Sequence, residues 1–159
     1  MKDTLEILIV DDDAVHRRAV RLNMAGWGYS VTEADDGEEA VRQARLRSFD
    51  LILMDIRMTR MSGLEALEQI KKIQPAVPVI IMTAYASVET AVSAMKMGAD
   101  DYLTKPLNYD ELQIKIARTA ERRQLKKENE YLKERLGEKF DRRNLIGRSE
   151  PMIRLLEMV

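Results

Sequence analysis

The amino-acid sequence predicts an α/β domain, a doubly wound parallel sheet of five strands. Short apolar runs alternate with stretches of helical period along most of the 159 residues. Two of these runs are nearly unbroken hydrophobics, as expected of strands that are buried on both faces of a sheet. Repeated strand–helix units of this kind pack helices on both sides of a parallel sheet.

The predicted elements follow one another in strict alternation. Strands are predicted at apolar runs that end near turn or acidic residues: 7–10, 29–34, 51–54, 77–82 and 101–104. Helices are predicted between and after them: 14–25, 36–46, 63–74, 87–97 and from 108 onward. Gly26, Pro75 and Gly98 supply stop signals for the first, third and fourth helices. Asp13 precedes the first helix, where the common role of an Asp is the N-cap.

Composition excludes several classes of function. Charged residues make up 33% of the chain, yet the formal net charge is −1, so no overall field attracts nucleic acid or an anionic membrane. The chain has no cysteine, which excludes a disulfide framework and a thiolate zinc site. Neither a signal peptide nor a membrane-spanning segment is expected, and the predicted location is the cytoplasm.

Polar residues suited to chemistry fall at the predicted carboxyl ends of four strands, where a doubly wound sheet places its ligands. Asp11 and Asp12 follow the first strand, and single residues follow the others: Asp55, Thr83 and Lys105. Three carboxylates brought together repel one another and are driven to protonate unless a cation neutralises them. Oxygen ligands without nearby histidine or cysteine suit Mg²⁺. The sequence therefore predicts a magnesium site at this edge.

This ordered set, an acidic pair, a central Asp, a Thr and a Lys-Pro, resembles the response-regulator receiver domain of two-component signalling over about residues 5–122. The resemblance implies a flavodoxin-like strand order 2-1-3-4-5 and a sensor histidine kinase as partner. It makes Asp55 the phosphorylated carboxylate. It assigns Asp11, Asp12, Asp55 and the backbone carbonyl of Arg57 to the magnesium site.

The same resemblance gives roles to residues around that site. Thr83 and Lys105 are expected to grip phosphoryl oxygens, and Pro106 is expected to follow a cis peptide. Tyr102 corresponds to the switch aromatic, which turns inward on phosphorylation as Thr83 moves toward the phosphate. That movement repacks the face made by the fourth helix, the fifth strand and the fifth helix. The chemistry agrees, because phosphoryl transfer needs positioning and cations rather than a strong base.

The loop after Asp55 departs from the receiver pattern at two positions, and one histidine near the site needs an interpretation. The loop after Asp55 reads MTRMSG, with Thr59 where such receivers usually have Pro and Ser62 where they have an acidic residue or Asn. A less rigid loop and an atypical phosphoryl lifetime are expected.

His16, the only histidine, lies in the first helical turn. It is interpreted as a solvated helix residue rather than a phosphorelay or metal-binding group.

The last predicted helix continues beyond the sheet, because neither Pro nor Gly interrupts it until Gly137. Four of its residues follow 4, 3, 4 spacing, which is typical of a coiled-coil seam: Leu125, Asn129, Leu132 and Leu136. An Asn among leucines in such a seam favours a paired, in-register dimer. A homodimer is therefore predicted, and the alternative is a lone solvated helix with acids and bases paired along its surface.

The stretch LIGRSEPMIRLLEMV resembles the opening of the AAA+ ATPase module in sigma-54-dependent activators of the nitrogen-regulator class. The predicted organisation is a receiver domain at 1–122, a coiled-coil linker helix at 123–140 and a truncated start of the AAA+ module at 141–159. The chain has no Gly-rich phosphate-binding loop, so it is not expected to hydrolyse ATP by that route. It is not expected to be an enzyme beyond assisting its own phosphorylation and dephosphorylation.

Two other functions compete with the receiver. The letters DDDAV satisfy the Asp-x-Asp-x-Val pattern of a haloacid-dehalogenase-type Mg²⁺ phosphatase, with a Thr and a Lys downstream. That class also requires an acidic pair after its Lys, and here only helix and coiled coil are predicted to follow. A basic-zipper-like DNA binder is the second alternative. Its basic stretch, ERRQLKK, is short and interleaved with acids, so direct nucleic-acid binding is not expected.

Overall fold

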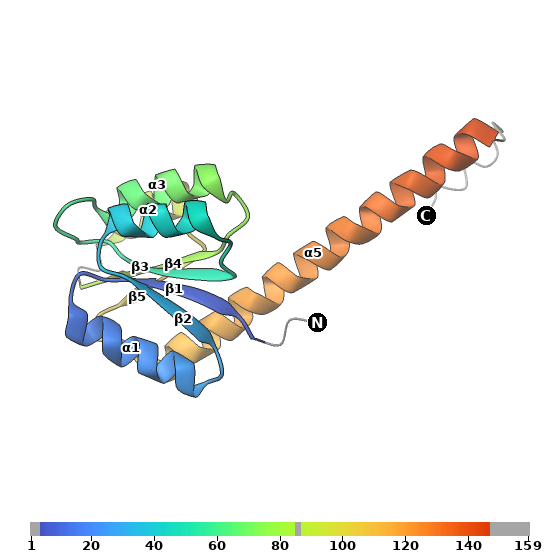
Figure 1. The fold of residues 1–159 in the computed structure, drawn as a ribbon. Coiled ribbons are helices and arrows are strands. Elements are labelled where there is room, and N and C mark those ends of the chain that lie inside the picture. The colour runs from blue at the N-terminus through green and yellow to red at the C-terminus, as the bar shows by residue number, and fades with distance from the viewer. Residues whose placement is uncertain (1–3, 85–86, 147–159) are drawn as a thin grey trace. The chain divides into compact units, whose positions relative to one another are not determined.

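The computed structural model describes residues 4–84 and 87–146, with residues 137–146 given by their backbone alone. Strands and helices alternate along these residues (Figure 1). The strands are β1 (Glu6–Val10), β2 (Ser30–Ala34), β3 (Leu51–Asp55), β4 (Val79–Thr83) and β5 (Asp101–Thr104). The helices are α1 (Ala14–Gly26), α2 (Gly37–Leu46), α3 (Gly63–Ile73), α4 (Val88–Lys96) and α5 (Tyr109–Ile146).

The strands form one parallel sheet in the order β2-β1-β3-β4-β5, which confirms the predicted topology. β1 and β3 are neighbours, with Val10 opposite Met54. The residues that follow these two strands therefore lie next to each other at the carboxyl edge. The side chains of both apolar runs are fully buried, which explains why neither run alternates with polar residues.

Helices cover both faces of the sheet. On one face, α2, α3 and α4 supply small and branched side chains, among them Ala40, Leu67 and Ala94, to a core with Leu8 and Ile52. On the other face, α1 and the start of α5 pack against the sheet through a second set: Val20, Met24, Leu112 and Ile116. Figure 1 shows α2 and α3 on the side of the sheet opposite α1. This double layer leaves the strand ends as the place where polar groups gather.

Most predicted boundaries are within two residues of the observed ones. β4 begins at Val79 rather than at residue 77, because Pro78 has no amide hydrogen for the ladder. α5 runs through Gly137 to Ile146, beyond the predicted end at residue 140. A glycine inside a helix weakens it by about 1 kcal/mol relative to alanine without ending it. The predicted start of an AAA+ module falls largely on residues 147–159, which lie outside the described residues.

The chain divides into two compact units, Met1–Ala120 and Glu121–Val159. The boundary falls within α5, whose first part carries Leu112 and Ile116 into the core of the first unit. Among the helices of the described residues, none has the length and apolarity that a membrane crossing requires.

Candidate functional site

The three predicted metal ligands come together at the carboxyl edge of the sheet. Asp11 directly follows β1, and Asp55 is the last residue of the neighbouring β3. One carboxylate oxygen from each of Asp11, Asp12 and Asp55 lies within 4.8 Å of the others. Asp11 and Asp55 are buried, whereas Asp12 is exposed, so the cluster opens to solvent on one side. A set of three oxygen donors of this kind fits a hard divalent cation such as Mg²⁺.

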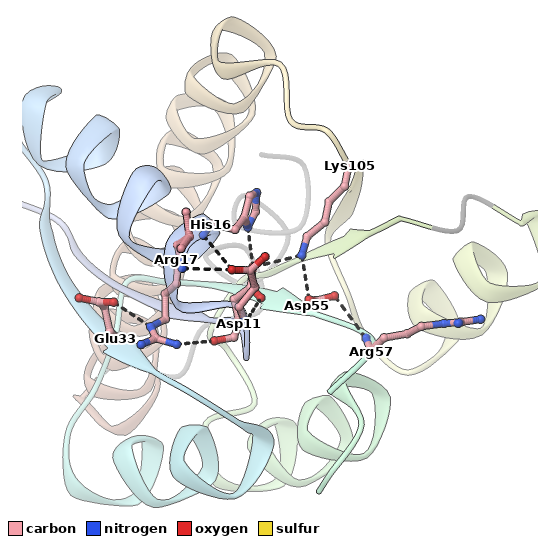
Figure 2. A network of polar contacts seen from close by, with 9 residues as sticks. Asp11, His16, Arg17, Glu33, Asp55, Arg57 and Lys105 are labelled. Atoms are coloured by element: carbon pink, nitrogen blue, oxygen red, sulfur yellow. Dashed lines mark hydrogen bonds and ion pairs between the residues drawn. The ribbon is translucent and has the colours of Figure 1, made fainter. Parts of the chain in front are cut away.

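Lys105 links two of these carboxylates. Its Nζ donates to Asp55 Oδ2 at 2.9 Å and to Asp11 Oδ2 at 3.1 Å (Figure 2). The peptide between Lys105 and Pro106 is cis, as the receiver resemblance implied. The backbone amide of Lys105 donates to the carbonyl oxygen of Thr83 at 2.8 Å, which joins the ends of β4 and β5. Thr83 itself is buried at the end of β4.

The two buried carboxylates respond to this environment in opposite directions. Burial would raise the pKa of Asp11, but hydrogen bonds from His16, the Asp13 amide and Lys105 outweigh it and lower that pKa to about 2. For Asp55, burial and the negative charge of Asp11 prevail over Lys105, so its pKa is raised. Burial opposes the charge of Lys105 too, yet its two carboxylate partners raise its pKa. The site therefore keeps Asp11 charged and makes the charge on Asp55 costly.

The first turn of α1 holds Asp11 through residues that were not predicted as part of the site. Asp13 caps α1, as expected, by accepting hydrogen bonds from the amides of Val15 and His16. The prediction of a solvated His16 is wrong: its ring is 21% exposed, and its Nδ1 lies 2.5 Å from Asp11 Oδ2. The Asp13 cap fixes the orientation of this turn, and the cap places the imidazole over Asp11 (Figure 2).

Arg17 is a second residue that the sequence did not single out. Its Nη1 donates to the backbone carbonyl of Asp11 at 2.7 Å, and its Nε donates to Glu33 Oε1 at 2.7 Å (Figure 2). Glu33 lies on β2 and also forms an ion pair with Arg21. The only sequence signal for these contacts is that Arg17 and Arg21 lie one helical turn apart, a spacing that is common on solvated helices. Through these two hydrogen bonds, Arg17 holds the main chain at Asp11 next to β2.

The loop after β3 approaches Asp55 through its backbone. The amide of Arg57 donates to Asp55 Oδ1 at 3.2 Å, while its side chain points away from the acidic cluster (Figure 2). The loop also has anchors that the sequence did not reveal. Arg60 forms an ion pair with Asp36, the N-cap of α2, and Ser62 caps α3 by accepting from the Glu65 amide at 3.2 Å.

The predicted switch residue Tyr102 lies on β5 with 39% of its surface exposed. Lys115 on α5 lies over its ring, 5.8 Å from the centroid, and donates to its backbone carbonyl at 2.9 Å. An open apolar groove lies beside the ring, lined by Val88, Ala91, Val92, Met95, Lys96 and Tyr102. Tyr102 is therefore turned outward in this structure, at the edge of an apolar surface.

Comparisons with known proteins agree on one family. The response regulator receiver domain matches residues 7–117. The transcriptional regulatory protein ZraR of Escherichia coli O157:H7 is 51% identical over 114 residues, which cover 72% of this chain and 26% of that protein. The regulatory protein AtoC of Escherichia coli strain K12 is 37% identical over 147 residues, 92% of this chain and 32% of that protein. The chain thus spans about a quarter to a third of these curated relatives.

Solved structures show the same likeness. A CheY-like receiver domain protein from Methanospirillum hungatei JF-1 superposes with a TM-score of 0.76 at 33% identity, covering 78% of this chain and 99% of that one. NtrX from Brucella abortus in complex with ADP also has a TM-score of 0.76, at 34% identity, over 81% of this chain and 30% of that one.

The opposite pKa directions predict opposite effects of two similar substitutions in the absence of Mg²⁺. At pH 7, Asp55→Asn should raise the free energy of unfolding, because it removes a charge that the folded state disfavours. Asp11→Asn should lower it, because the folded state favours that charge. Each change should be on the order of 1–2 kcal/mol, measured by urea denaturation.

Both effects on the free energy of unfolding should depend on pH. A raised folded-state pKa costs stability only above the unfolded value of about 4, so the gain from Asp55→Asn should vanish as pH falls below about 4. The loss from Asp11→Asn should shrink as pH falls from about 4 toward 2, where Asp11 itself protonates. Destabilisation by Asp55→Asn at pH 7 would contradict this electrostatic account.

Proposed function

The chain belongs to the response regulator receiver domain family, and we propose that Asp55 is its phosphorylated residue, with Mg²⁺ held by Asp11, Asp12 and Asp55. The observation that carries the proposal is the convergence of three carboxylates and one lysine at a single sheet edge. Their ligand oxygens lie within 4.8 Å of one another, and Lys105 Nζ lies 2.9 Å from Asp55. Family membership gives no support to the phosphatase alternative.

The proposed reaction transfers a phosphoryl group from the phosphohistidine of a sensor kinase. A carboxylate oxygen of Asp55 forms the new bond to phosphorus while the nitrogen–phosphorus bond breaks and the imidazole leaves with the bonding electrons. Bound Mg²⁺ supplies positive charge next to the transferring group. Lys105 supplies a second positive charge, and the Thr83 hydroxyl donates to a phosphoryl oxygen. The backbone carbonyl of Arg57 is the proposed further oxygen ligand of the ion.

We propose that the output is control of transcription through a sigma-54-dependent AAA+ module in a longer protein. The names of the relatives, transcriptional regulatory protein and regulatory protein, support this output. The resemblance of LIGRSEPMIRLLEMV to the opening of such a module supports it as well. In this proposal, Thr83 and Tyr102 change position on phosphorylation, and the apolar groove beside Tyr102 changes with them.

The second unit supports a further part of the proposal, a homodimer through α5. Leu125, Leu132 and Leu136 are 58%, 58% and 65% exposed, although they lie on one helical stripe with Asn129. When a second helix covers large apolar side chains at this spacing, their surface is removed from water and the pair of helices is stabilised. The resulting pair of helices would carry the receiver's state to the next module.

A phosphorylation assay tests the acceptor residue. Incubation with a small phosphodonor and Mg²⁺ should add one base-labile phosphoryl group to the intact chain, as detected by mass spectrometry, and Asp55→Asn should abolish the addition. Asp35→Asn is the matched control, because Asp35 is an exposed residue outside the site, and it should leave labelling unchanged. A label that persists in the Asp55→Asn variant rejects Asp55. Multiple turnover of an unrelated phosphate ester with Asp11 as the covalent residue would instead favour the phosphatase.

Sedimentation of the full chain tests the dimer. The wild type should sediment as a dimer that Leu125→Lys combined with Leu132→Lys splits, because two charges in a paired seam cannot be desolvated. Gln124→Lys with Tyr131→Lys places the same charges outside the seam, at the same spacing, and should leave the dimer intact. A wild-type monomer, or a dimer that survives the seam substitutions, removes the coiled-coil proposal.

A further inference from the structure

We infer that His16 is a positioning residue for the metal site: it donates a hydrogen bond from Nδ1 to Asp11 Oδ2 and holds that carboxylate ready to ligate Mg²⁺. The inference rests on the proposed magnesium site and adds a residue to its supporting shell. His16 is the only histidine in the chain, and it lies in the first turn of α1.

Asp11 is held at both carboxylate oxygens by that one helical turn. The Asp13 amide donates to Oδ1 at 2.9 Å, and the His16 ring nitrogen lies 2.5 Å from Oδ2. Arg17 adds a hydrogen bond to the Asp11 backbone carbonyl. Because Asp11 is fully buried, water cannot replace a lost partner at little cost. The helix start therefore fixes both the position and the rotation of this carboxylate.

The surroundings of the imidazole indicate which nitrogen carries the proton. Nδ1 faces a carboxylate oxygen, which can only accept, so Nδ1 must be the donor. Nε2 is buried and has no hydrogen-bond partner among the described residues. A hydrogen on Nε2 would be a buried donor without a partner among the described residues. Hydrogen on Nδ1 satisfies the contact to Asp11.

His16 has a role that Lys105 cannot fill alone. Among the described residues, Asp11 Oδ2 accepts from both His16 and Lys105, whereas Oδ1 accepts from the Asp13 amide alone. Each carboxylate oxygen has about two acceptor positions, so Oδ1 keeps one for a cation. Lys105 is shared with Asp55 and, in the proposed reaction, supplies positive charge to the transferring phosphoryl group. His16 then remains as the side chain that keeps Oδ2 in place and Oδ1 aimed at the ion.

Magnesium binding to the unphosphorylated full chain tests the inference, measured by isothermal titration calorimetry. His16→Leu fills similar space without a donor and should weaken Mg²⁺ binding about 10-fold or more, the usual cost of losing a supporting hydrogen bond. In His16→Asn, the side-chain amide nitrogen is the same number of bonds from the Cα atom as Nδ1 is in histidine, so it can donate to the same oxygen. It should therefore keep Mg²⁺ affinity within about 3-fold of the wild type, whereas a role in packing alone predicts no such rescue.

The outcomes separate this inference from the proposed function. A wild type that fails to bind Mg²⁺ overturns both. If the wild type binds Mg²⁺ and both variants bind it with wild-type affinity, the role of His16 is overturned and the proposed magnesium site stands. Equal loss of affinity in the two variants overturns the role of His16 as well. Nitrogen-15 NMR of the His16 ring in the wild type is independent of any variant's folding. Hydrogen on Nδ1 supports the inference, and hydrogen on Nε2 alone overturns it.

Discussion

Three carboxylates with oxygens within 4.8 Å of one another repel each other, and the groups around them compensate for this repulsion. Lys105 contacts two of the three, and the first turn of α1 supplies donors to Asp11. The compensation is unequal, because Asp11 receives enough hydrogen bonds to stay ionised while burial leaves Asp55 with a raised pKa. Of these two carboxylates, Asp55 is thus the one whose negative charge is costly in the folded protein.

The fold imposes this crowding through strand order and close backbone contacts. β1 and β3 are neighbours at the centre of the sheet, so Asp11 and Asp55 cannot separate without breaking the ladder between them. The loop that follows Asp55 returns so closely that the Gly63 amide donates to the Ile56 carbonyl at 2.7 Å. A Cβ atom at Gly63 would lie 2.1 Å from the Asp55 carbonyl oxygen, which leaves no space for a side chain. Close packing of the backbone therefore holds Asp55 at the carboxyl edge of the sheet.

The sequence predicted the sheet and the meeting of the carboxylates because both follow from strand ends, and strand ends are visible as apolar runs that stop at charged residues. Asp11, Asp55 and Lys105 are each at such a stop. His16 could not be assigned from the sequence, because its direction depends on how the Asp13 cap starts α1, and a helical period does not fix that phase. The contacts of Arg17 and Arg60 depend on long side chains crossing between elements, which no local pattern encodes.

The most direct test of the central claim is the dependence of folding stability on Mg²⁺, measured by urea denaturation at constant ionic strength. If the acidic cluster is completed by the ion, the free energy of unfolding rises with Mg²⁺ concentration, by about 2.7 kcal/mol at 100 times the dissociation constant. Sodium chloride at matched ionic strength should not reproduce that rise. A stability that stays constant across the Mg²⁺ series would contradict the account, because the repulsion would then be balanced by the protein alone.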